Sequence, residues 1–243
     1  MATKLGSVVG FRNGIYNGYK VIGTQTLGLR GLVLWLKFNE GSGNIAYDSS
    51  FYNNQGTIYG ATWTDGKFGK ALSFDGVDDW VEVSSSDTLT IPDRTELTVT
   101  AWVKRNELNK FHTIVSLGGW NREGWTFRIE SNNKIMFIAR FTDGTITGEI
   151  EGGYIDTNWH FVAVVYDGRV HLYVDGEEVA SSDYFGKVIS GRDFPLKIGV
   201  LDIGGDFFNG IIDEVRIYNR ALSENEIKML YYNRIGAVPS KII

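Results

Sequence analysis

From about residue 32 onward, apolar and polar residues alternate in many short runs, and this alternation restricts the chain to a fold built from β-strands. A period of two is typical of strands that bury one face. Asp-Gly pairs and asparagines separate the runs, and these residues tolerate the backbone conformations of tight hairpin turns. The clearest stretch, YDGRVHLYVDGEEVA, turns twice, at Asp167-Gly168 and at Asp175-Gly176. We therefore predict an all-β fold, an antiparallel two-sheet β-sandwich or jelly roll.

A single stretch near the C-terminus predicts a short helix, ALSENEIKML at residues 221–230. Ser223 can cap its first turn while Glu226 reaches back to the cap, which is the pattern of a capping box. Ile227 and Leu230 then share one face of the helix. We expect this helix to close the sandwich.

The composition excludes several classes of function. The chain has no cysteine, which excludes disulfides, thiolate zinc sites and cysteine nucleophiles. Its net charge is −5 and its lysines and arginines are scattered, so we expect no nucleic-acid partner. No apolar run is long enough to span a bilayer. We find no phosphate loop, no dinucleotide fingerprint and no GxSxG nucleophile elbow.

Residues 1–31 differ from the rest because they are rich in glycine yet more apolar than an ordinary solvated linker. They lack the basic-then-apolar order of a secretory signal. We expect this N-terminal arm to dock, either on its own domain or on a neighbouring subunit. In the second case it would add a strand to a sheet edge and build a homo-oligomer or larger assembly. We predict a domain at 32–235 and a C-terminal tail at 236–243.

Five stretches occur in an order that resembles a known family: LVLWLKFNEGSGNIAYDSSFYNNQGTIYG, FDGVDDWVEV, LTVTAWVKR, NWHFVAVVYDGRVHLYVDGEEVA and FNGIIDEVRIYNRALSENEI. The series is similar to the laminin-G-like jelly-roll domains of the concanavalin A-like lectin/glucanase superfamily, and it covers roughly residues 32–235. The resemblance implies two stacked antiparallel sheets with a curved, concave face. It leaves the function open, because this fold hosts lectins, glycosidases, adhesion modules and structural spacers.

The acidic residues do not form the pattern of a glycosidase. Glucanases on this fold use acids that alternate on one strand, because successive side chains point to opposite faces. Asp213 and Glu214 are adjacent, so we expect them on opposite faces unless a bulge intervenes. Glu149 and Glu151 have the required spacing, but the stretch has no third acid. We therefore predict that the protein is not an enzyme.

A structural calcium ion is a further expectation. The resemblance implies such an ion beside the edge where the first and last strands meet, and calcium prefers carboxylate and amide oxygens. In the alternative, Asp48 and Asn54 organise a turn by hydrogen bonds and Asp213 accepts backbone N–H groups from it. The candidate ligands are Asp48, Asn54, Asp213 and Glu40.

Aromatic and polar residues of the loop LGGWNREGWTFR indicate a glycan-binding face. An exposed tryptophan in a glycine-rich turn is hard to explain by core packing, and sugar sites combine aromatic rings with a few polar groups. Alternatively, the tryptophans cover a hydrophobic edge or form a subunit contact. The candidate glycan-binding residues, some from strands that could line the same concave face, are Trp120, Trp125, Arg122, Arg128, Arg140 and Tyr154.

Two functions from different classes remain open. The first is a non-catalytic carbohydrate-binding or adhesion module, displayed outside the cell, on a cell surface or within a larger assembly, with a glycan or surface polysaccharide as partner. The second is a structural building block of a virion or appendage, attached through residues 1–31. A polysaccharide-degrading enzyme is the third and least favoured reading.

Overall fold

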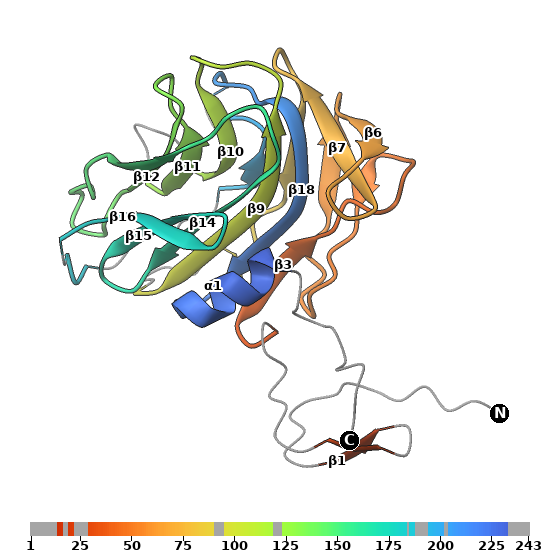
Figure 1. Ribbon diagram of the computed structural model, residues 1–243, viewed down its shortest axis with the longest axis horizontal. Coiled ribbons are helices and arrows are strands. Elements are labelled where there is room, and N and C mark those ends of the chain that lie inside the picture. Colours follow the sequence, from red (N-terminus) through yellow and green to blue (C-terminus); the bar gives the residue numbers. More distant parts are fainter. Residues whose placement is uncertain are drawn as a thin grey trace.

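The computed structural model describes residues 29–89, 95–118, 123–183, 185–187, 194–201 and 204–232, with the backbone of two short strands, β1 (Gly14–Tyr16) and β2 (Tyr19–Val21). Strands β1 and β2 pair antiparallel. The other strands form two antiparallel sheets that stack as a β-sandwich (Figure 1). This confirms the predicted all-β jelly-roll class. The rest of the predicted arm and the tail at 236–243 lie outside the described residues.

One sheet, here called the helix-side sheet, has the strand order β16-β15-β14-β9-β18-β7-β6, and β3 also pairs with β18. Its long central strand β18 carries the DEVRIYN stretch. The strands are β3 (Leu32–Leu36), β6 (Thr62–Asp65), β7 (Lys70–Asp75), β9 (Leu97–Arg105), β14 (His160–Tyr166), β15 (Val170–Val174), β16 (Glu177–Ser181) and β18 (Asn209–Tyr218).

The second sheet, here called the far sheet, has the order β13-β12-β11-β10-β17-β8-β5-β4. Among the described residues, eight strands form this sheet. They are β4 (Ile45–Ala46), β5 (Gly56–Tyr59), β8 (Trp80–Val83), β10 (His112–Leu117), β11 (Trp125–Ile129), β12 (Lys134–Ala139), β13 (Ile150–Tyr154) and β17 (Leu196–Ile198).

The main hydrophobic core lies between the two sheets and is built from one face of each strand. Its members alternate along the strands, as the period of two requires. A second, smaller core lies on the outer face of the helix-side sheet, and Trp102 is buried there rather than between the sheets.

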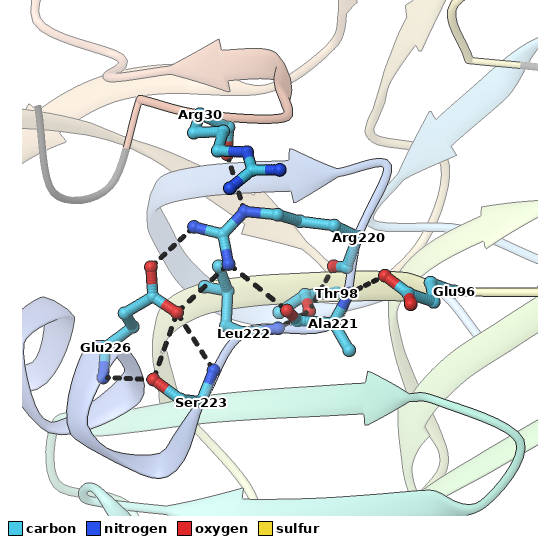
Figure 2. Close-up of polar contacts among 8 residues, drawn as sticks. All are labelled: Arg30, Glu96, Thr98, Arg220, Ala221, Leu222, Ser223 and Glu226. Carbon is cyan, nitrogen blue, oxygen red and sulfur yellow. Dashed lines mark hydrogen bonds and ion pairs between the residues drawn. The ribbon is translucent and has the colours of Figure 1, made fainter. Parts of the chain in front are cut away.

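The short helix α1 (Glu224–Tyr231) packs over this second core, where Ile227 and Leu230 are buried (Figure 1). Ser223 and Glu226 form the predicted capping box. Arg220 stabilises the N-terminal end of the helix, because its guanidinium donates to Glu226 Oε1 at 2.5 Å (Figure 2). Its Nε donates to Arg30 O at 2.8 Å. Among the described residues, no helix has the length and hydropathy to cross a membrane.

A β-bulge in β18 corrects one prediction from the sequence. Ile212 and Val215 both lie in the main core, so the two residues between them point to the outer face together. The register with β9 shifts between Asp213 and Arg216, and Glu214 adopts a φ of 54°. The expectation that Asp213 and Glu214 face opposite sides is therefore wrong, because the bulge inserts one extra residue into the alternation.

Candidate functional site

The outer face of the far sheet carries the described members of the predicted glycan-binding set. Phe127 and Phe137 lie in the core, so Arg128 on β11 points outward. Arg140 follows the core residue Ala139 and lies on the same side. Tyr154 pairs with Lys134 across β12 and β13 and is 58% exposed. The strand register thus places Arg128, Arg140 and Tyr154 on one face.

Arg128 is the centre of a polar cluster at one end of this face. Its Nε donates to Glu130 Oε1 at 2.5 Å and its Nη1 to Asp206 Oδ2 at 2.9 Å. The guanidinium carbon lies 4.8 Å from the centroid of the Phe111 ring. Arg128 and Glu130 are buried, whereas Phe111 is 40% exposed. Burial raises the pKa of Glu130, and the ion pair with Arg128 opposes that shift. Arg140 Nη1 donates to Gly144 O at 2.8 Å.

Trp125 is not the exposed turn residue that the sequence suggested. It is 3% exposed, it belongs to β11, and its ring packs 6.2 Å from that of Phe137 in the main core. Trp125 is the first residue of the strand, and its side chain points between the sheets. Trp120 and Arg122 lie outside the described residues.

Acidic side chains next to this cluster were only partly anticipated. Glu151 on β13 points outward and accepts a hydrogen bond from Asn132 Nδ2 at 2.8 Å. The charges of Glu149 and Glu151 add to the raised pKa of Glu130. The sequence did not reveal Glu130 as a third acid, because it follows the end of β11, about twenty residues before Glu149 and Glu151 in the chain.

Asp48, a predicted calcium ligand, is surrounded by hydrogen-bond donors. Its Oδ1 accepts from the backbone N–H groups of Trp35 and Ser50 at 2.9 and 2.8 Å. Its Oδ2 accepts from the Ser50 hydroxyl at 2.6 Å and from Asn54 N at 2.8 Å. Because four donors point at this carboxylate, it does not fit as a cation ligand. Asn54 also uses its amide group within the protein, to Val33 O and Ser86.

The remaining two candidate ligands keep an oxygen without a partner. Glu40 Oε1 accepts from Tyr47 N at 2.9 Å, and Asp213 Oδ2 accepts from Phe68 N at 2.9 Å. Among the described residues, Glu40 Oε2 and Asp213 Oδ1 are buried and have no hydrogen-bond partner. Asp213 thus binds the loop before β7 rather than the Asp48 turn. Among the described residues, only Asp75, Asp78 and Asp79 form a group of three acids within 4.8 Å.

The environment of Asp213 is the most strongly perturbed among these carboxyls. Burial raises its pKa to about 7, and the neighbouring Glu214 adds to the shift, whereas N–H groups of the loop at Phe68 oppose it. Glu214 itself accepts from Trp35 Nε1 at 2.8 Å and forms an ion pair with Arg216. The two acids therefore have separate structural partners, which does not resemble a catalytic pair.

Comparison with known proteins identifies the family. The sequence model of the concanavalin A-like lectin/glucanases superfamily matches residues 74–228, from the end of β7 into α1. The chain belongs to this superfamily. The resemblance inferred from the DEVRIYN and neighbouring motifs is thereby confirmed.

Relatives of this superfamily member include adhesion G-protein coupled receptor V1 of Danio rerio, 23% identical over 160 residues, which are 61% of this chain and 3% of the receptor. Two solved structures share the fold. The binding domain of Paraclostridial Mosquitocidal Protein 1 has a TM-score of 0.70 at 18% identity, over 86% of this chain and 53% of that one. Domain 4 of an extracellular arabinanase from Geobacillus stearothermophilus, in complex with arabinotriose, has a TM-score of 0.64 at 23% identity, over 82% of this chain and 98% of that one.

Replacing Asp48 with alanine tests whether this residue binds calcium or organises its turn by hydrogen bonds. We expect the free energy of unfolding to fall by about 2–3 kcal/mol, because four partly buried donor groups lose their acceptor. We expect the same loss with added calcium and with excess chelator, measured by thermal melting. Asp87→Ala serves as an acidic control, because Asp87 is exposed in a turn. A wild-type melting temperature that rises with calcium would support the metal instead.

Proposed function

We propose that this chain is a non-catalytic carbohydrate-binding or adhesion module that works outside the cell, on a surface or within a larger assembly. The observation that carries the proposal is the cluster of Arg128, Glu130 and Asp206 beside the half-exposed ring of Phe111. Sugar sites need an aromatic face for the C–H groups of the ring and fixed polar groups for its hydroxyls.

The cluster has both properties before any ligand binds. The ion pairs hold the two carboxylates in fixed positions, so little side-chain entropy is lost when a hydroxyl donates to them. A carboxylate has about four lone-pair positions, and Asp206 uses one of them for Arg128 while its side chain stays 30% exposed. Phe111 adds an accessible ring at the edge of the same cluster.

A structural neighbour supports this proposal. The arabinanase domain that was solved with arabinotriose is matched over 98% of its length, so the two proteins correspond as whole domains. The mosquitocidal protein neighbour is likewise a binding domain. These two neighbours favour a binding role for this chain.

Substituting Phe111 by alanine tests the proposed site. On a glycan array, we expect wild-type protein to bind at least one oligosaccharide and Phe111→Ala to bind it about tenfold more weakly, because the stacking surface is lost. Leu108→Ala is a matched control, since Leu108 is 37% exposed on the same loop and lies outside the polar cluster. Equal loss in both variants, or no glycan bound by the wild type, would count against the proposal.

A second candidate function is a structural building block attached by residues 1–31. The paired backbone strands β1 and β2 show that this segment contains residues able to form a sheet, which supports strand exchange with a neighbour. The oligomeric state of the full chain and of a variant lacking residues 1–30 discriminates the two functions. Assembly lost on truncation, with no glycan bound, would favour the building block.

Polysaccharide degradation is a third candidate, favoured only by the charge effect of Glu149 and Glu151 on the pKa of Glu130. Arg128 holds Glu130 in an ion pair at 2.5 Å, which does not suit an acid that must release its proton to a substrate. Hydrolysis of a bound polysaccharide that disappears in Glu151→Gln would establish it.

A further inference from the structure

Two aromatic rings lie against each other on the outer face of the far sheet, away from the Arg128 cluster. Tyr59 on β5 and Trp80 on β8 are directly paired across the strands, and their ring centroids are 4.7 Å apart at an interplanar angle of 18°. Ile58 and Val81 beside them lie in the main core, so both rings point to the outside. Tyr59 is 40% exposed and Trp80 is half-buried.

Trp80 is therefore not a residue of the main core. A core tryptophan would point between the sheets, as Trp125 does. Here the side chain stands on the outer face of a regular strand and is supported by the ring of Tyr59. Because both residues sit within strands rather than on a loop, the position of this aromatic platform is fixed by the sheet.

A row of polar side chains runs beside the platform. Thr57 on β5 is paired with Glu82 on β8, and Glu82 is paired with Lys197 on β17. The three residues therefore lie side by side on three neighbouring strands. Glu82 is two residues beyond Trp80 on the same strand, so this row lies about 7 Å from the ring row. That spacing is comparable to the width of one sugar ring, whose hydroxyls would then reach Thr57 and Glu82.

Several acidic side chains lie in or beside the turn that leads to Trp80. Asp79 is 6% exposed, and its Oδ2 accepts from Asp75 N at 2.8 Å in the turn that leads to Trp80. A Cβ added to Gly60, the residue after Tyr59, would lie 1.9 Å from Asp79 Oδ1, so this carboxylate adjoins the platform. Asp75, Asp78 and Asp79 lie within 4.8 Å of one another. Together with Glu82, these three aspartates make four carboxylates in this region, where the polar row contributes one amine, that of Lys197.

We propose that Tyr59 and Trp80 form a glycan subsite that takes a neutral sugar, with Thr57, Glu82 and Lys197 as its hydrogen-bonding row. This inference rests on the proposed carbohydrate-binding function and adds a second place on the same face, with a preference. The excess of carboxylates repels sialylated and uronic oligosaccharides, whose own carboxylates would lie within a Debye length of these acids. Neutral sugars meet no such repulsion.

A binding experiment with four proteins tests the subsite. The probes are arabinotriose and an array that presents neutral oligosaccharides beside their sialylated forms, and the proteins are wild type, Tyr59→Ala, Tyr59→Phe and Tyr232→Ala. Tyr232 is 61% exposed and caps the C-terminal end of α1, which packs on the helix-side sheet. It therefore provides an exposed-tyrosine control. Titration calorimetry with the best neutral probe gives the affinities, and thermal melting checks that each variant is folded.

We expect Tyr59→Ala to bind about tenfold more weakly, and Tyr59→Phe and Tyr232→Ala to stay within about twofold of wild type. Sialylated probes are expected to bind more weakly than their neutral forms at low salt. Unchanged affinity in Tyr59→Ala, or a preference for sialylated probes, overturns the subsite while the binding function stands. Wild-type protein that binds no probe at all overturns the proposed function itself.

Discussion

Above pH 7, Asp213→Asn is expected to have a larger free energy of unfolding than the wild type. Below pH 7, the substitution is expected to remove the pH dependence of stability that Asp213 gives the wild type. The carboxyl is fully buried, and burial raises its pKa to about 7 from an ordinary 3.8. The folded state therefore holds this proton more tightly than the unfolded state. Its stabilising effect is complete below pH 3.8 and is lost as the pH rises through about 7.

The size of this effect follows from the two pKa values. Ionising the buried carboxyl costs the folded state at most about 4 kcal/mol once both states are ionised. Asparagine keeps an oxygen for Phe68 N but brings an NH₂ group that needs its own partner, so we expect a net gain of about 1–3 kcal/mol at pH 8. At pH 4 we expect wild type and variant to be nearly equal.

Denaturant unfolding between pH 4 and pH 8 measures this difference. All other ionisable groups, including Glu214 beside Asp213, are the same in both proteins, so the difference between the two stability profiles isolates Asp213. Asp213→Ala is the control that also removes the acceptor of Phe68 N, and we expect it to be less stable than Asp213→Asn at every pH. Parallel profiles for wild type and Asp213→Asn would show that the carboxyl is ionised in the folded protein throughout.

Arg105→Ala is expected to destabilise the protein by about 3–5 kcal/mol, among the largest effects of any single substitution here. Arg105 is fully buried at the end of β9. Its Nη2 donates to Asn133 Oδ1 at 2.8 Å and to Ile155 O, and its Nε donates to Asp156 O at 3.3 Å. Alanine removes the side-chain donor to Ile155 O and Asp156 O and leaves a cavity, and both defects cost free energy, whereas Asn133 Oδ1 keeps the hydrogen bond from Asn109 N.

Denaturant unfolding of three variants separates the causes. Arg105→Met fills most of the volume without restoring the hydrogen bonds, so we expect it to recover only part of the loss. Lys104→Ala, the next residue along the same strand and half-buried, is expected to change stability by less than about 0.5 kcal/mol. A loss as small in Arg105→Ala as in Lys104→Ala would refute a structural role for the guanidinium.

Much of the fold was predictable because its signals are local. The turns at Asp167-Gly168 and Asp175-Gly176 separate β14, β15 and β16 as expected. The capping box of Ser223 and Glu226 forms because both residues lie within one helical turn. Neither feature depends on distant parts of the chain.

The candidate site was less predictable because it depends on which strands become neighbours. Trp125 and Trp80 are both tryptophans beginning a strand, yet Trp125 points into the core and Trp80 points out. Nothing within either stretch distinguishes them. Glu130 follows β11 and Glu151 lies on β13, and only the strand order shows that these two strands lie on either side of β12.

The sequence by itself determined the all-β class, the order of strands and turns, the capped helix and the superfamily, since periodicity, turn chemistry and capping act over a few residues. Only the tertiary structure decided the bulge at Glu214, the burial of Arg105 and the pairing of Tyr59 with Trp80. These features follow from the register between strands that are distant in sequence, and one extra residue in a strand reverses every side chain beyond it.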